Sequence, residues 1–447
     1  TAIVDEWLGG KEEELRTEGR RLLAIDVESL PSPKLADLID EACAYATNAW
    51  WWHFRLHGAA VWHLGVLGLE LERDHGWTDI EFADLFTGLS DTSTAPGAAQ
   101  DAIVHLIADA GGLDALAAAT SIDDVRRISS RVSTAIDEYL DTWGLRAMRY
   151  EVAYPTVAEH PEWLLRQLQT HRARPAGDDA ARRAAAERRL LDTLGDTDAT
   201  RARLASARRT FPVRESNEFA SVGLPIAVLR RLGLGAGRRL VRNGNLERPD
   251  DVFDLTVSEV TSLLRAAPLA PTDPVLRART RRDARLAADE REAPLLIGPA
   301  SGAAIAAPDM SGFPVEIANG VNAMVWYTRK IIGDEGAARE PSKDVQGLAV
   351  SSGTYEGTAR VLLDESELER IESGDVLICP ITSPVWSMVF PALGALVCDT
   401  GGALSHPAII AREFGIPAVV GTGNATMAIP DGATVRVDGD HGTVSVV

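Results

Sequence analysis

The chain has 447 residues, 45% of them hydrophobic, and a net charge of -20 at pH 7. This length predicts two or three domains, and the acidic charge excludes a general nucleic-acid binder, which needs a basic surface. No apolar run reaches the roughly 18 residues of a membrane helix, and the first residues lack the pattern of a signal peptide. Cys43, Cys379 and Cys398 form no CxxC motif or disulfide framework. We therefore expect a cytoplasmic protein that contacts neither membrane nor nucleic acid.

Residues 1–298 are predicted to form a mainly helical domain. Apolar residues recur at intervals of three and four along residues 32–76, which predicts one long helix. Further helices are predicted over residues 94–112, 121–144, 177–195, 224–244 and 256–267. The segment GLGAGRR, residues 233–239, has the glycines of a phosphate loop but no preceding strand and no Walker lysine pattern. We interpret it as a helix junction.

The composition changes near residue 293. Gly, Ala and Pro become frequent, and we interpret residues 299–345 as a linker with one short helix. Residues 346–447 alternate short β-rich runs with Gly, Pro and Asp turns and with helical stretches at 366–374 and 406–415. This pattern predicts a compact α/β domain. The expected fold is thus multi-domain, with a helical N-terminal domain followed by an α/β domain.

The stretch GGALSHPAIIAREFGIPAVVG, residues 401–421, places a histidine at the predicted start of a helix. Ser405 suits the N-cap position, and a proline after His406 suits the first turn. Gly401 and Gly402 allow the backbone to approach a ligand closely. Free N–H groups and the helix dipole favour an anion here, so a neutral His406 imidazole is suited to attack phosphorus. The alternative is a capped helix with a chance histidine.

This stretch resembles the phosphohistidine signature of the swivelling domain in PEP-utilising enzymes, which include PEP synthase, pyruvate phosphate dikinase and rifampicin phosphotransferase. Upstream, residues 351–364 resemble the entry segment of that domain, with Ser352 where proline is usual. Residues 373–402 resemble the strand, Thr-x-Pro-x-Trp loop and strand that lead to the histidine. The resemblance implies that His406 is the phosphorylated residue. The supporting residues expected around it are Gly401, Gly402, Ser405 and Arg412.

The resemblance extends into the helical region. Residues 141–168 and 238–260 resemble parts of the substrate-binding domain in relatives of rifampicin phosphotransferase and phenylphosphate synthase. Leu145 stands where that family often has histidine, and Tyr150 lies near a position that is commonly acidic. These departures leave the substrate open.

Several polar and aromatic residues of this region are candidates for binding the substrate. His53 and His57 lie four residues apart on one helix face, a spacing that suits a metal, but no third ligand is evident and no metal site is predicted. Arg146 is a candidate anchor for an anion or a hydroxyl group, and clustered tryptophans can wall an apolar pocket. The alternatives are histidines and tryptophans of an ordinary core and a surface ion pair. The full candidate set is Trp52, His53, Arg55, His57, Arg146 and Trp386.

The family passes phosphate from ATP to the histidine, which requires an ATP-grasp domain, and no such domain is evident in these residues. The resemblance implies a phosphotransferase component that binds a small apolar or aromatic hydroxyl compound and carries phosphate on His406. A separate ATP-grasp partner would bind ATP and Mg and charge His406, and this chain would bind no cofactor itself. One alternative is a stand-alone enzyme in which His406 is the general acid or base of a dehydration, elimination or cyclisation. Another is a non-catalytic binding protein.

Overall fold

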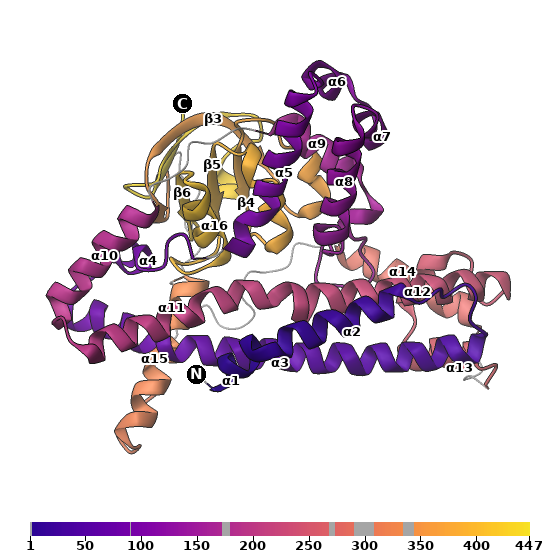
Figure 1. The fold of residues 1–447 in the computed structure, drawn as a ribbon, viewed down its shortest axis with the longest axis horizontal. Helices are drawn as coiled ribbons and strands as arrows, with labels where there is room; N and C mark the ends of the chain where they lie inside the picture. The colour runs from indigo at the N-terminus through magenta and orange to yellow at the C-terminus, as the bar shows by residue number, and fades with distance from the viewer. Residues whose placement is uncertain (1, 90, 172–178, 268–272, 290–307, 334–343) are drawn as a thin grey trace.

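The computed structural model describes the chain over residues 2–89, 91–171, 179–267, 273–289, 308–333 and 344–447. Long helices lie in a layer along the lower half of Figure 1, and an α/β domain sits above one part of this layer. A group of shorter helices, α5 to α9, stands next to the α/β domain. The predicted multi-domain fold, helical first and α/β second, is confirmed.

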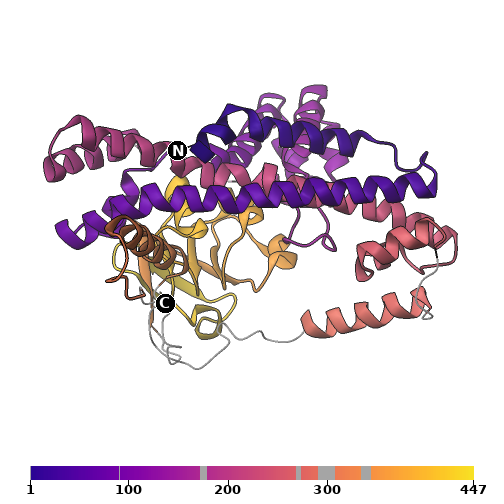
Figure 2. The same cartoon turned by 90° about the horizontal axis from the view of Figure 1, so that it is seen from below.

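The helical layer is built on α3 (Ser32–His75), a helix of 44 residues that spans about 66 Å at 1.5 Å per residue. Gly76 ends it in the left-handed conformation, with φ at 68°. Figure 2 shows α3 running along the layer. The other helices before the α/β domain are α1 (Ala2–Glu6), α2 (Glu12–Ala24), α4 (Asp79–Asp84), α5 (Asp91–Asp109), α6 (Leu113–Ala118), α7 (Ile122–Arg126), α8 (Ser130–Trp143), α9 (Glu162–Thr170), α10 (Asp179–Leu194), α11 (Asp198–Glu218), α12 (Leu224–Arg242), α13 (Val257–Leu264), α14 (Pro274–Asp289) and α15 (Val315–Ile332).

Helices α11 and α12 form one continuous helical rod through the π-helical turn η3 (Phe219–Gly223). The rod is long and apolar enough to cross a membrane by composition, but 78% of its most apolar window is buried inside the protein. Burial of this kind is typical of a core helix, and η3 lies in the middle of the packed layer, where all five of its residues are buried.

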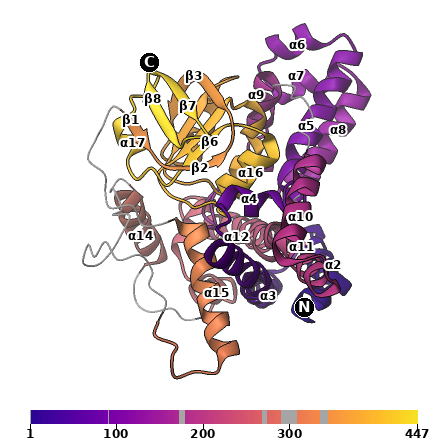
Figure 3. The ribbon, with the colours of Figure 1, turned by 90° about the vertical axis from the view of Figure 1, so that its left-hand side faces the viewer.

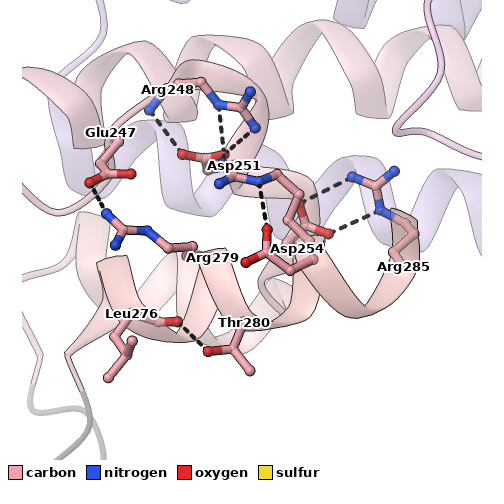
Figure 4. A network of polar contacts seen from close by, with 10 residues as sticks. Glu247, Arg248, Asp251, Asp254, Leu276, Arg279, Thr280 and Arg285 are labelled. Atoms are coloured by element: carbon pink, nitrogen blue, oxygen red, sulfur yellow. Dashed lines mark hydrogen bonds and ion pairs between the residues drawn. The ribbon is translucent and has the colours of Figure 1, made fainter. Parts of the chain in front are cut away.

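Helix α14 is held to the rest of the layer by arginine–carboxylate pairs. On α14, Arg285 pairs with Asp254 at 3.0 Å and Arg282 pairs with Asp251 at 2.7 Å, both on the neighbouring 3-10 helix η4 (Pro249–Asp254), where Asp251 also pairs with Arg248 at 3.0 Å. Figure 4 shows these contacts together with that of Arg279 with Glu247. Most of these groups are partly exposed, so each pair adds little stability and chiefly fixes orientation.

Helix α15 packs along α3, as the view in Figure 3 shows. Two glycines of α3 permit the close approach: an ideal Cβ at Gly65 would lie 2.5 Å from the carbonyl oxygen of Ala323, and one at Gly68 would lie 2.0 Å from the Trp326 ring. The predicted short helix of residues 299–345 is therefore an 18-residue member of the helical layer. Residues 299–307 and 334–343 of that predicted linker lie outside the described residues.

The α/β domain contains an eight-stranded sheet in the order β1-β8-β7-β3-β4-β5-β6-β2. Strands β3 to β6 are parallel, and the outer pairs are antiparallel. Every residue of β4 and β5 is buried, as expected for central parallel strands. The strands are β1 (Asp344–Gln346), β2 (Leu348–Ser351), β3 (Thr354–Val361), β4 (Val376–Cys379), β5 (Ala395–Cys398), β6 (Ala418–Val420), β7 (Thr434–Asp438) and β8 (Thr443–Val446), and the α-helices are α16 (His406–Phe414) and α17 (Ala425–Ala428).

Three predicted elements differ in the structure. The single helix expected over residues 121–144 is two helices, because the Ser129 hydroxyl accepts a hydrogen bond from the Val132 N–H at 3.2 Å and caps the second. Residues 366–374 contribute to a 3-10 helix rather than an α-helix. Residues 233–239 lie inside α12, so the helix-junction interpretation is wrong; Gly237 faces the Pro249 carbonyl, which leaves no room for a Cβ.

The two parts of the molecule share one apolar core. Buried side chains of the short helices, such as Ile103 and Leu164, belong to the same cluster as Trp386 and Phe390 of the α/β domain. The buried Gln100 side chain spans this contact and donates a hydrogen bond to the Met388 carbonyl at 3.1 Å. The α/β domain is therefore docked firmly against the helices in this conformation.

Candidate functional site

The candidate site lies where the parallel strands β4 and β5 end. The loop after β5 leads directly into α16, whose first residue is His406. The Thr400 side chain donates to the Pro380 carbonyl at 2.9 Å and joins this loop to the one after β4. Gly415 closes α16 in the left-handed conformation, with φ at 61°. The carboxyl end of parallel strands is the usual location of a ligand site in α/β domains.

The glycine pair contacts protein backbone in this structure. The N–H groups of Gly401 and Gly402 donate to the carbonyls of Ile332 and Ile331 at 3.1 and 2.9 Å, which satisfies carbonyls left free at the end of α15. An ideal Cβ at Gly402 would lie 2.5 Å from the Lys330 carbonyl oxygen. The approach of these glycines to a ligand stays a prediction, and the close approach that the structure shows is to α15.

Ser405 and Arg412 are the other two supporting residues expected around His406. Ser405 occupies the N-cap position, but its side chain makes no capping hydrogen bond, and its buried hydroxyl has no partner among the described residues. Arg412 is buried and donates to the carbonyls of Val350 and Ala403 at 3.0 and 2.8 Å. Burial lowers the Arg412 pKa to about 10. Arg412 therefore links the histidine loop, through Ala403, to Val350 of β2.

The His406 ring is held by a carboxylate of the helical layer. His406 Nδ1 lies 2.9 Å from Oε2 of Glu215 on α11. Arg214 contacts the other Glu215 oxygen at 3.0 Å and donates to the Tyr327 hydroxyl on α15 at 2.9 Å. Burial raises the Glu215 pKa, but the Arg214 charge and the His406 hydrogen bond outweigh it and lower the pKa to about 2.

This arrangement assigns the tautomer of the imidazole. An ionised Glu215 only accepts hydrogen bonds, so Nδ1 of His406 carries the proton. Nε2 of the neutral ring then bears the lone pair, and this buried atom has no hydrogen-bond partner within the described part of the chain. His406 therefore presents an oriented nucleophile or base at Nε2.

His53 and His57 lie next to this pair. His53 Nδ1 contacts Asn217 Oδ1 at 2.8 Å, and the two histidine rings are 4.3 Å apart. Burial lowers the His57 pKa to about 4, helped by the charges of His53 and Arg214. Both rings act as neutral polar groups beside α11. No cluster of three potential metal ligands occurs among the described residues.

Three other candidate residues are placed in packing contacts. Trp52 is buried against Trp7 at 6.0 Å between ring centroids, and the Arg55 guanidinium stacks on it at 4.3 Å. Trp386 is buried in the α/β domain, and its Nε1 donates to Glu365 Oε1 at 3.0 Å. None of these three residues lines the cavity described next, whereas Arg146, another candidate, does.

A cavity of about 230 Å³ lies between the helices and the α/β domain. Arg149 flanks it and bridges the two parts, with Nη2 at 2.6 Å from Asp364 Oδ2 and Nε at 3.6 Å from Glu365 Oε2. Apolar side chains and a few polar groups line it, a typical composition for a small-molecule site. The lining includes Arg146, Tyr150, Glu218, Glu365, Ser383 and Val385.

At this cavity, Arg146 and Glu218 are charged side chains for which the described part of the chain provides no hydrogen-bond or ion-pair partner. Arg146 stacks on Trp143 at 4.8 Å, and its Nε and Nη1 have no hydrogen-bond partner among the described residues. Burial lowers the pKa of Arg146. Burial and the charge of Glu215 raise the pKa of Glu218, while Arg146 and His406 oppose this rise.

Sequence reasoning missed the residues Arg214, Glu215 and Glu218. Their signal is the stretch RESNE, residues 214–218, in which two acidic residues three apart share a helix face beside an arginine. That helix, α11, was itself not predicted. Only the packing of α11 against the histidine loop distinguishes these charges from an ordinary surface group.

The fold and site define a class of protein: an α/β domain with a histidine at a helix start, docked on a helical domain whose carboxylate contacts that histidine. Residues 371–442 match the family description "PEP-utilising enzyme, mobile domain", and residues 53–215 match "Rifampicin phosphotransferase fourth domain". The chain therefore joins a domain that matches the mobile domain of PEP-utilising enzymes to a helical region that matches the fourth domain of rifampicin phosphotransferase.

Curated relatives agree with this assignment. The chain is 33% identical over 329 residues to a rifampicin phosphotransferase of Streptomyces sp., which covers 70% of this chain and 34% of that protein. It is 32% identical over 236 residues to an uncharacterised phosphotransferase of Bacillus subtilis (strain 168), covering 53% of this chain and 26% of that one. It is 40% identical over 129 residues to a phosphoenolpyruvate synthase of Aeropyrum pernix, and this match covers 27% of this chain and 15% of that protein. The chain spans about a third or less of these relatives.

Proposed function

We propose that this chain is the substrate-binding and phosphohistidine-carrying part of a phosphotransferase. His406 Nε2 accepts a phosphoryl group and passes it to a hydroxyl of a small apolar or aromatic molecule in the cavity between the domains. The observation that carries the proposal is the contact of His406 Nδ1 with the ionised Glu215, which leaves the Nε2 lone pair free. An ATP-grasp unit outside these 447 residues, with ATP and Mg, supplies the phosphoryl group.

The site favours the phosphorylated ring electrostatically. When Nε2 attacks phosphorus and the bond to the leaving group breaks, the ring keeps its Nδ1 proton and becomes cationic. Glu215 stabilises this cation at 2.9 Å, and Arg214 keeps Glu215 ionised. When a hydroxyl oxygen then attacks phosphorus, the P–N bond breaks and its electrons return to Nε2.

The cavity supports an apolar acceptor molecule. Met148, Ile226 and Val385 supply apolar walls, and Arg146 offers N–H donors to an oxygen of the substrate or of the phosphoryl group. We propose Arg146 as the principal polar anchor of this site. Trp52 and Arg55 act only through packing.

A second candidate function is acid–base catalysis without phosphate. The apolar core shared by the α/β domain and the short helices favours it, because a firmly docked domain keeps His406 in one place. Glu215 would orient the ring for proton transfer as well as for phosphoryl transfer. This reading predicts turnover of a substrate without ATP.

Phosphorylation of the whole chain tests the proposal. Phosphoramidate phosphorylates histidine chemically, and an ATP-grasp polypeptide added separately with radiolabelled ATP phosphorylates it enzymatically. We expect an acid-labile, base-stable phosphate on His406, absent in His406→Ala and retained in His441→Ala, whose side chain is 79% exposed. No phosphate on His406 in either experiment contradicts the proposal.

A further inference from the structure

We propose that Glu218 is the general base that takes the proton of the acceptor hydroxyl as the phosphoryl group leaves His406. The inference rests on the proposed function and adds a catalytic residue to it. Its basis is the position of Glu218 in the cavity, one helical turn beyond the carboxylate that holds the His406 ring.

Glu215 and Glu218 share one face of α11, because residues three apart on a helix are neighbours. Glu215 is fully engaged by His406 and Arg214. Glu218 lines the cavity instead, and its carboxylate makes no hydrogen bond or ion pair within the described stretches of the chain. The two carboxylates thus have different surroundings: Glu215 orients the His406 ring, and Glu218 faces the cavity.

The other carboxylate of the cavity is not available in the same way. Glu365 Oε1 accepts hydrogen bonds from Ser383 Oγ at 2.9 Å and from Trp386 Nε1 at 3.0 Å, and its Oε2 lies 3.6 Å from Arg149. These contacts hold the Glu365 carboxyl group in a fixed position. Among the cavity-lining residues given above, Glu218 is therefore the carboxylate able to accept a substrate proton.

The local helix geometry places Glu218 at the cavity. It is the last residue of α11, and the π-helical turn η3 begins immediately after it. Gly223 and Ile226 line the same cavity as Glu218. The spacing of five between Glu218 and Gly223 fits one wide π-helical turn, and such turns are frequent at functional sites.

The charges around Glu218 suit it to this task. Burial and the nearby Glu215 raise its pKa, whereas Arg146 and His406 lower it, and Glu365, Arg149 and Tyr150 complete the charged and titratable groups of the cavity wall. The net effect is a pKa above the ordinary glutamate value, which makes Glu218 a stronger base than an exposed carboxylate.

The proposed step balances as follows. The hydroxyl oxygen forms a bond to phosphorus, and its proton passes to the Glu218 carboxylate. The bond from phosphorus to His406 Nε2 breaks, and its electron pair returns to the ring, which stays protonated at Nδ1 against Glu215. Solvent removes the proton from Glu218 after the phosphate ester leaves.

Methanol and water serve as acceptors in the test, because both fit a cavity of about 230 Å³. The whole chain is charged with phosphoramidate, the reagent is removed, and 31P NMR follows the loss of phosphohistidine and the appearance of methyl phosphate and inorganic phosphate. The variants are Glu218→Gln, Glu218→Asp, and Glu138→Gln as a matched control on the exposed surface of α8.

We expect phosphoramidate to phosphorylate His406 in Glu218→Gln as it does in the wild type. The variant should then transfer this phosphate about 100-fold more slowly, which is the lower end of a general-base contribution. Glu218→Asp keeps part of the rate, and Glu138→Gln keeps all of it. Wild-type transfer slows as the pH falls through the Glu218 pKa, and Glu218→Gln loses this dependence. Equal transfer rates in Glu218→Gln and wild type overturn the assignment, as does a charged wild type that transfers to neither acceptor. A His406 that takes no phosphate overturns the proposed function itself.

Discussion

The substitution Glu215→Gln tests how the helical domain activates His406. The amide oxygen of glutamine still accepts the Nδ1 hydrogen bond that Glu215 now receives at 2.9 Å, but the negative charge is gone. The ring then loses the group that favours its phosphorylated, cationic form. We predict that phosphoramidate charges this variant more slowly at Nε2.

The magnitude follows from the electrostatics of Glu215. Its pKa is lowered from 4.5 to about 2, which corresponds to roughly 3 kcal/mol of stabilisation of the carboxylate by its surroundings. Arg214 supplies the largest lowering contribution, and His406 the next. A charged hydrogen bond exceeds a neutral one by about 1 to 2 kcal/mol. Charging should therefore slow by about 10-fold, and by no more than about 100-fold.

The assay combines 31P NMR for the rate and the site of phosphorylation with 15N NMR of the His406 ring for its tautomer. The single variant leaves Arg214 as a buried, uncompensated charge, which costs about 3 to 5 kcal/mol of stability. The double variant Arg214→Gln/Glu215→Gln removes both charges and keeps the test valid if the single variant unfolds. A variant that is folded and charged at Nε2 as fast as the wild type would refute the role assigned to Glu215.

Two further predictions concern stability. Burial raises the Glu413 pKa to about 7 from 4.5, because the folded protein disfavours the ionised carboxylate. The folded state is therefore most stable below the ordinary pKa, where Glu413 is protonated, and it loses this stability as the pH rises through 7. Thermal melts should show wild type losing on the order of 2 to 3 kcal/mol between pH 5 and pH 8 from this group, while Glu413→Gln loses less; identical pH profiles would contradict this. Gly402→Ala should lower the melting temperature and slow His406 charging, because its Cβ would lie 2.5 Å from the Lys330 carbonyl oxygen. The control Gly58→Ala, with nothing within 4 Å of its Cβ in exposed helix, should raise stability by about 0.5 to 1 kcal/mol, and a loss in that control would show that the melts do not report local packing.

The sequence by itself determined the elements whose signals are local. The 3.6-residue periodicity of residues 32–76 predicts α3, and the turn residues of 346–447 predict the short strands, because side-chain pattern and turn chemistry act within a few residues. The Ser-His-Pro step likewise places His406 at the start of α16. The resemblance of residues 401–421 to a known signature extended this local information to the family.

Tertiary structure alone decided what surrounds the histidine. Glu215 lies 191 residues from His406 in the chain, and no local pattern shows that α11 brings it to within 2.9 Å of Nδ1. The same packing turns Gly401 and Gly402 toward α15. It also places Trp52 and Arg55 away from the contact of His53 with Asn217, although Trp52, His53 and Arg55 all lie on α3. Periodicity fixes which side chains share a face, but the partner of that face depends on long-range packing. The sequence therefore identified His406 as the candidate residue, but it did not identify Glu215, the carboxylate that contacts its ring.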